Sequence, residues 1–182
     1  MIKKITSPAT TEEILKLSAG DMVELSGILL TGRDAAHKRM VEYLYKGIPL
    51  PFDIKNQSIY YTGPCPAPPG RIIGSCGPTT SFRMDGYTPL LLDLGLKIMI
   101  GKGQRSPEVV EAIVRNQAVY LAAAGGAGAL IARCVKKAEV LAFEDLGPEA
   151  VYRLEVEKFP LIVAIDSRGS SIFESGPAQF RI

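Results

Sequence analysis

The polar run Gly77–Asp85 places three hydroxyl side chains next to one another, with an arginine two residues further on. The Gly-Pro pair at its start supplies a rigid bend. We expect the hydroxyls of Thr79, Thr80 and Ser81, together with nearby backbone N–H groups, to converge on one carboxylate. The guanidinium group of Arg83 can then close over that carboxylate through two parallel hydrogen bonds. The run therefore predicts an anion-binding loop.

Two further cations lie in similar surroundings, Arg33 within Thr31–Asp34 and Lys102 within Gly101–Ser106. A single arginine or lysine is most often solvated surface charge. Each of these lies in a glycine-containing turn with small polar neighbours, however, and the grouping favours a binding role for at least two of the three cations. The glycines around Lys102 lack the spacing of a phosphate loop or a dinucleotide fingerprint, so we do not expect nucleotide binding.

His37 is the only histidine of the chain, which excludes a two-histidine metal site within it. Its position early in an expected helix suggests a structural imidazole, with a catalytic role as the less favoured alternative. Cys65, Cys76 and Cys134 are spaced too unevenly for a disulfide framework, a zinc knuckle or an iron–sulfur cluster. We therefore expect reduced thiols and no metal site in this chain.

The overall composition indicates one ordinary globular domain over residues 1–182, with 47% hydrophobic and 22% charged residues. A net charge of +2 gives no broad positive field, so nucleic acid is not an expected partner. The weakly polar stretch Val119–Ala132 is interrupted by glycines and is shorter than the ~20 apolar residues of a membrane helix. Because the segment Met1–Pro8 has no apolar signal region, we expect a cytoplasmic protein.

Helical and extended patterns alternate along the chain, and Gly63–Gly70 between them predicts an ordered irregular loop. The expected helices are Thr10–Leu17, Asp34–Leu44 with Asp34 as its cap, Thr88–Leu94, Pro107–Asn116 and Gly126–Val135. The expected strands are Met22–Leu30, Ser58–Thr62, Lys97–Ile100, Val119–Ala122, Glu139–Phe143 and Leu161–Ile165. This order favours a layered α/β domain with a mixed sheet and flanking helices. The cations Arg33, Arg83 and Lys102 all fall at or beyond expected strand ends, where ligands usually bind.

Several motifs occur in an order that is typical of one family. They are Ser26–Gly27, Thr31–Arg39, Tyr61–Pro64, Gly77–Asp85, Gly101–Gly103, Gly125–Ala127 and Ile165–Ser167. On these motifs, which extend over almost the whole length, the chain resembles the β subunit of two-subunit class I fumarate hydratases and L(+)-tartrate dehydratases. That subunit is equivalent to the C-terminal domain of the single-chain forms.

The resemblance implies a single swivelling β/β/α-type domain that docks on an α subunit. The α subunit would hold a [4Fe–4S] cluster through three cysteines of its own, with one iron open to act as a Lewis acid on the departing hydroxyl. By motif, Arg33, Thr79, Arg83 and Lys102 would line the active site from this side, with the segment from Thr79 to Arg83 around one substrate carboxylate. Thr79 would be the candidate proton carrier.

The resemblance leaves the substrate open. Fumarate/malate and tartrate chemistry need the same carboxylate contacts, and we expect fumarate/malate as the first choice. The other class of function is a non-catalytic module that binds a small carboxylate or assists assembly. The absence of a complete set of cluster ligands or an acid–base pair in this chain is compatible with both classes.

Overall fold

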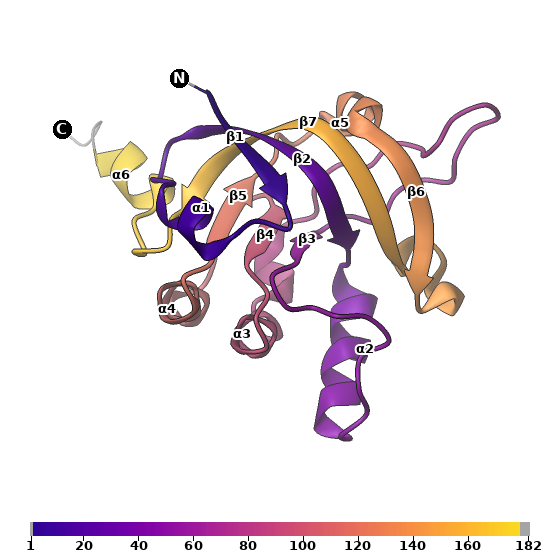
Figure 1. Ribbon diagram of the computed structural model, residues 1–182, viewed down its shortest axis with the longest axis horizontal. Coiled ribbons are helices and arrows are strands. Elements are labelled where there is room, and N and C mark those ends of the chain that lie inside the picture. Colours follow the sequence, from indigo (N-terminus) through magenta and orange to yellow (C-terminus); the bar gives the residue numbers. More distant parts are fainter. Residues whose placement is uncertain (1, 179–182) are drawn as a thin grey trace.

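The structure, a computed structural model, describes residues 2–178, which are built round one sheet of seven strands (Figure 1). The strands are β1 Ile2–Ser7, β2 Met22–Thr31, β3 Ser58–Tyr60, β4 Ile98–Gly101, β5 Val119–Ala122, β6 Val135–Ala142 and β7 Val151–Ile165. Their order is β1-β2-β3-β4-β5-β7-β6, and β2 pairs with β7 as well. Strands β2, β3, β4, β5 and β7 therefore form a closed barrel, which β1 and β6 extend.

The part of the barrel wall formed by β3, β4 and β5 is buried on both faces. Strands β2 to β5 run parallel to their neighbours, and β7 runs antiparallel to β2 and β5. Along β4, Ile98 and Ile100 belong to the core inside the barrel, whereas Met99 belongs to a second core against the helices. Parallel strands that are covered on both faces read as continuous apolar runs, which is why their short sequences were recognisable.

Helices cover the outside of the barrel on one side (Figure 1). These outer helices are α2 Asp34–Tyr45, α3 Thr88–Asp93, α4 Pro107–Asn116 and α6 Ile172–Ala178. The helices α1 Thr11–Leu15 and α5 Gly128–Cys134 instead pack against the core that includes the barrel interior, and 3₁₀ turns lie at Ser81–Met84 and Glu144–Glu149. The predicted capping box of α1 is present, because Thr10 and Glu13 satisfy each other's backbone N–H groups. No helix within residues 2–178 is long and apolar enough to cross a membrane.

The expected mixed sheet with flanking helices is confirmed, but the sheet closes into a barrel, which was not predicted. Closure depends on β7, which spans fifteen residues where only Leu161–Ile165 was predicted. Its first two thirds contain charged residues and Pro160, and they pair with β6, the preceding strand, and with β2, which is distant in sequence. Gly27 allows β2 to bend there, since its φ is +102° and a Cβ would clash with the carbonyl oxygen of Ser7.

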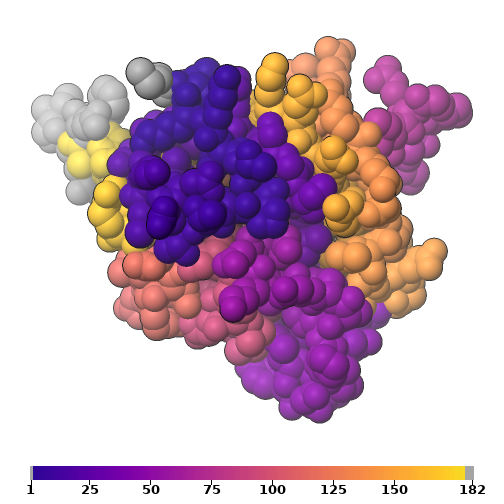
Figure 2. Space-filling view, viewed as in Figure 1, coloured from indigo at the N-terminus to yellow at the C-terminus, as the bar shows by residue number. Residues whose placement is uncertain are grey.

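Other differences are local. Strand β1 and helix α6 were not predicted, and β6 begins at Val135 where a helix was expected to end. Residues 64–73 form the expected irregular loop, which is held by backbone hydrogen bonds between Cys65 and both Gly74 and Ser75. This loop projects from the body of the molecule beside β6 (Figures 1 and 2).

Candidate functional site

The predicted site residues gather at one edge of the barrel. Strands β2, β3 and β4 are parallel, so their carboxyl ends lie together, and the loops that follow them carry Arg33, the segment from Thr79 to Arg83, and Lys102. The second and third loops are joined directly. The backbone N–H of Ser81 donates to the carbonyl of Lys102 at 2.8 Å, and the N–H of Lys102 donates to the carbonyl of Thr79 at 3.3 Å. The expectation that strand ends position these cations is confirmed.

Arg33 and Arg83 are linked through one carboxylate. Asp34 Oδ2 lies 3.1 Å from Nε of Arg33, and Asp34 Oδ1 lies 2.8 Å from Nε of Arg83. Glu149 Oε1 lies 2.6 Å from the same Nε of Arg33. Partial burial alone would raise the pKa of Asp34, but backbone and Arg33 hydrogen bonds and the charge of Arg83 lower it below its usual value. We call this group of four side chains, Arg33, Asp34, Arg83 and Glu149, the arginine rim.

The start of α2 differs from the prediction in a way that explains the rim. Arg33, not Asp34, is the N-cap residue, and it makes no side-chain cap. Asp34 is the first helical residue, which leaves its carboxylate free to contact the arginines. Glu149 Oε2 instead accepts the backbone N–H of Ala35 at 3.1 Å. The sequence pattern predicted Asp34 as a helix cap and therefore did not show that its carboxylate pairs with two arginines.

The three adjacent hydroxyls do not point the same way. Ser81 is fully buried, and its Oγ lies 2.8 Å from the hydroxyl of Tyr120. Thr79 is half-buried and Thr80 is exposed, and neither hydroxyl has a hydrogen-bond partner within residues 2–178. The backbone N–H of Thr79 donates to the carbonyl of Tyr61 at 2.6 Å. Two of the three hydroxyls are thus available to a ligand, whereas that of Ser81 fastens the loop to β5.

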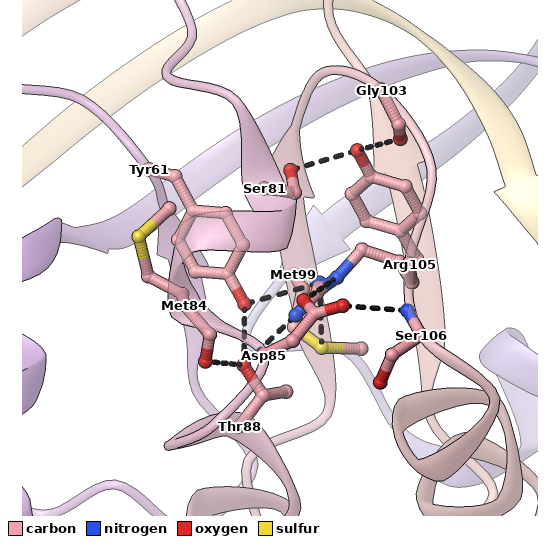
Figure 3. A network of polar contacts seen from close by, with 10 residues as sticks. Tyr61, Ser81, Met84, Asp85, Thr88, Met99, Gly103, Arg105 and Ser106 are labelled. Carbon is pink, nitrogen blue, oxygen red and sulfur yellow. Dashed lines mark hydrogen bonds and ion pairs between the residues drawn. The ribbon is translucent and has the colours of Figure 1, made fainter.

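A buried ion pair lies beneath the loop (Figure 3). Nε of Arg105 lies 2.7 Å from Asp85 Oδ1, and its Nη2 donates to Thr88 Oγ1 at 2.8 Å. The guanidinium group also lies 5.2 Å from the ring centroid of Tyr61 and 5.0 Å from that of Tyr120. We call these five side chains the buried floor.

Sequence reasoning missed the buried floor. Asp85 is the last residue of the polar run, and Arg105 follows Lys102 by three residues. Both therefore belong to segments that the sequence marks as candidate binding loops, but nothing in their spacing predicts that they pair. Gly101 at the end of β4 is also part of the arrangement. A Cβ there would overlap the hydroxyl of Ser81 and lie 2.9 Å from Tyr61.

His37 supports the loop that carries Arg33. Its Nδ1 donates to the carbonyl of Arg33 at 3.0 Å, and its ring meets that of Tyr61 edge-on at 5.2 Å between centroids. Complete burial lowers the pKa of His37 to about 4, so the imidazole is neutral near pH 7. These contacts agree with the structural interpretation of this residue.

The glycines before and at the start of α5 allow close packing. A Cβ on Gly128 would lie 2.5 Å from Ser75 Oγ and 2.8 Å from the backbone nitrogen of Gly77. The carbonyl of Gly128 also accepts the N–H of Cys76 at 3.2 Å. Gly128 therefore packs against the start of the polar run, and Gly125 lies beside the stem of Lys102.

The cysteines do not fit an iron–sulfur cluster. Cys65 is exposed, Cys76 is buried and Cys134 is intermediate. Burial raises the pKa of Cys76 to about 12 and also raises that of Cys134, so both are neutral thiols near pH 7. Within residues 2–178, no group of three or more histidine, cysteine or acidic side chains could hold a metal ion.

The site as a whole can bind anions. Lys102 is exposed, and its Nζ has no ion-pair or hydrogen-bond partner among the described residues. The terminal guanidinium nitrogens of Arg33 and Arg83 likewise make no hydrogen bond to the described part of the chain, because both arginines are held through Nε. Guanidinium groups of this kind bind carboxylates in a bidentate manner.

Comparisons with known proteins identify the family of this chain. The family model described as Fumarase C-terminus matches residues 2–176. The chain is 40% identical to "Fumarate hydratase 1, mitochondrial" of Leishmania major, over 92% of this chain and 31% of that protein. It is 40% identical to "Fumarate hydratase class I, anaerobic" of Escherichia coli K12, over 84% of this chain and 28% of that protein.

A relative of similar length is also known. The chain is 41% identical to "Putative L(+)-tartrate dehydratase subunit beta" of Methanocaldococcus jannaschii, over 91% of this chain and 88% of that protein. By contrast, the chain spans about a third of the length of the fumarate hydratases that it matches. The match over residues 2–176 and these identities place the chain in the family of fumarase C-terminal domains.

Proposed function

We propose that this chain is the β subunit of a two-subunit, [4Fe–4S]-dependent hydro-lyase that reversibly adds water to, or removes it from, a small dicarboxylate. Fumarate/malate is the preferred substrate pair. The observation that carries the proposal is the pair of arginines held side by side by Asp34, next to Lys102 and the free hydroxyl of Thr79, at one edge of a fumarase C-terminal domain.

The proposed reaction builds up negative charge that these cations can stabilise. Dehydration moves a proton from the carbon beside one carboxylate to a base, and hydroxide leaves the neighbouring carbon, so that one water is lost overall. Proton loss places additional negative charge on the adjacent carboxylate. Arg83 and Lys102 would stabilise this charge, and Arg33 would bind the second carboxylate. The two arginines are held by ion pairs before substrate binds, and such preorganisation favours electrostatic catalysis.

Thr79 is the proposed proton carrier of this chain. Its backbone is fixed on both sides by Tyr61 and Lys102, whereas its hydroxyl is free within the described residues. A threonine hydroxyl is a weak base, so it needs a neighbouring charge or a carboxylate that shares the proton. We propose that the partner subunit supplies that carboxylate.

The partner subunit is also the proposed holder of the cluster, because the cysteines of this chain do not fit one. A relative of similar length carries the name subunit beta, and the fumarate hydratases are about three times as long as the matched region. These lengths support a separate α subunit. The name of the similar-length relative also favours L(+)-tartrate dehydration as the second candidate function. Cytoplasmic location stays a prediction from the sequence.

Co-purification tests the proposal. The chain is expressed with the neighbouring reading frame, and the product is assayed anaerobically with fumarate, L-malate and L(+)-tartrate. We expect a brown, iron-containing complex with hydro-lyase activity on one of these substrates, and no activity for the chain alone. A colourless single protein that binds dicarboxylates without turnover would support the non-catalytic module instead.

The role of Thr79 has its own test in the same complex. Thr79→Val keeps the shape of the side chain but removes the hydroxyl, so turnover should be lost while dicarboxylate binding changes little. Thr6→Val on the exposed face of β1 is the matched control. Near-normal turnover of Thr79→Val would assign the base to the partner subunit.

A further inference from the structure

Asp34 contacts two arginines that belong to different loops. Arg33 precedes α2, and Arg83 lies in the 3₁₀ turn Ser81–Met84 before α3. The two Nε atoms lie 3.1 Å and 2.8 Å from the two oxygens of Asp34. No other side chain within residues 2–178 forms an ion pair with Arg83. Asp34 is therefore the side-chain link between the loops that follow β2 and β3.

Both contacts use the same part of the guanidinium group. A guanidinium carries one N–H on Nε and four on the terminal nitrogens. Because the carboxylates occupy Nε, the two terminal nitrogens of each arginine remain as a fork that can receive a further carboxylate. The described residues make no hydrogen bond to either fork. The arrangement holds the arginine stems and leaves their binding ends open.

Glu149 strengthens the hold on one side. Its Oε1 lies 2.6 Å from Nε of Arg33, and its Oε2 accepts the N–H of Ala35 at 3.1 Å. Glu149 lies just before β7, so a third loop contributes to the arginine rim. Two carboxylates and two guanidinium groups cancel in formal charge. Affinity for an anion at the rim then depends on the direction of the two forks and on Lys102 more than on net charge.

We propose that Asp34 is a positioning residue for the ligand's carboxylates, which orients the forks of Arg33 and Arg83, and that Glu149 assists it at Arg33. This inference rests on the proposed function for the identity of the ligand, a small dicarboxylate. The opposite possibility is that Asp34 occupies the place of a substrate carboxylate and competes with it. The two possibilities predict opposite changes in affinity when the carboxylate is neutralised.

The first test is steady-state kinetics of the co-purified complex with Asp34→Asn. Positioning predicts that KM for the dicarboxylate rises by about three- to tenfold, from the modest strength of two partly exposed ion pairs, with a change in kcat of less than about twofold. Asp34→Glu restores the charge and should recover part of the loss. Asp93→Asn, which removes a 2.8 Å ion pair with Arg115 away from the site, is the matched control. A lower or unchanged KM for Asp34→Asn would overturn the proposal.

The second test does not depend on catalysis. The chain is labelled with ¹⁵N-arginine, assembled with unlabelled partner, and the Nε–H signals of Arg33 and Arg83 are assigned with Arg33→Lys and Arg83→Lys. Asp34→Asn should shift both signals and speed their exchange with water, whereas Glu149→Gln should affect Arg33 alone. Signals that do not respond to Asp34→Asn would contradict positioning even in an active enzyme. If the signals respond but no dicarboxylate is turned over, the proposed function fails and the positioning role stands.

Discussion

Two arginine–aspartate pairs near the same barrel edge differ in what surrounds them. In the buried floor, the side chains of Arg105 and Asp85 are 0% and 7% exposed, whereas those of Arg83 and Asp34 in the arginine rim are 51% and 32% exposed. The Arg105 guanidinium donates hydrogen bonds to Asp85, Thr88 and Tyr61. The guanidinium of Arg83 pairs with Asp34 through Nε, and its terminal nitrogens make no hydrogen bond to residues 2–178. An arginine whose Nε and both terminal nitrogens donate within the protein stabilises the fold, whereas one whose terminal nitrogens have no partner among the described residues can bind a ligand.

The largest expected effect comes from breaking the buried floor. Arg105→Met keeps much of the side-chain volume but leaves the carboxylate of Asp85 buried without its cation. Removing one partner of a buried pair costs about 3–5 kcal/mol, because the remaining charge is uncompensated. Urea denaturation should report this loss in the free energy of unfolding.

The matched control for that variant is Arg115→Met. Arg115 pairs with Asp93 at 2.8 Å, but the two side chains are 54% and 46% exposed. Exposed pairs contribute ~0.2–1 kcal/mol, so the control should lose less than about 1 kcal/mol. If both variants lost the same stability, burial would not distinguish the floor from other ion pairs of this protein.

The second effect is a pH dependence that comes from His37, beneath the rim. Its pKa is about 4 in the folded state against 6.5 in the unfolded chain. Between these values the unfolded state binds a proton that the folded state does not, so the free energy of unfolding falls as the pH falls from 6.5 to 4. The full loss is about 3 kcal/mol.

His37→Asn isolates this contribution, since no other histidine is present. The variant can be less stable at pH 7 and still be informative, because the comparison is between slopes. Denaturation measured between pH 7 and pH 4.5 should show a shallower decline for the variant than for the natural chain. Parallel declines would mean that the imidazole is accessible in the folded state and that this part of the site is not closed.

Local signals in the sequence were sufficient for much of the fold. The helix Pro107–Asn116 and the strand Val119–Ala122 have the predicted bounds, because a proline at the first helical turn and short buried apolar runs act over a few residues. Closure of the barrel was not predictable in this way. It depends on pairs such as Leu29 with Leu154, which are far apart in sequence and carry no local mark of their pairing.

The candidate site likewise has one part that local sequence signals predict, the exposed cations, and one part that they do not, the buried floor. Arg33, Arg83 and Lys102 could be placed together because the carboxyl ends of parallel strands meet at one edge. The pairing of Arg105 with Asp85 could not, since burial of a charge is decided by what packs over it. Ser81 shows the limit within a single motif. Three neighbouring hydroxyls look equivalent in sequence, yet the third turns inward to Tyr120.

The third effect is a change in the catalytic efficiency of the complex when Arg83 of the arginine rim is replaced. Arg83→Lys keeps the charge but removes the fork, so one charge-assisted hydrogen bond of ~1.5–3 kcal/mol should be lost from the bound substrate. We expect kcat/KM of the complex to fall by roughly ten- to over a hundredfold while the free energy of unfolding hardly changes. Arg115→Lys is the control for charge-preserving substitution at an exposed pair. Unchanged kinetics would remove Arg83 from the site.

The smallest expected effect is the coupling energy between the two side chains of each arginine–aspartate pair. It compares the exposed pair of the arginine rim with the buried pair of the buried floor directly. A double-mutant cycle with Asp34→Asn and Arg83→Met should give a coupling energy of ~0.2–1 kcal/mol in denaturation, because water screens both side chains. The corresponding cycle with Asp85→Asn and Arg105→Met should give a larger value, because each single variant strands a buried group. Equal coupling energies would mean that the rim is as firmly held by the protein as the floor. Arg83 would then have little freedom to meet a substrate carboxylate, and its exposure would have to be explained by something other than binding.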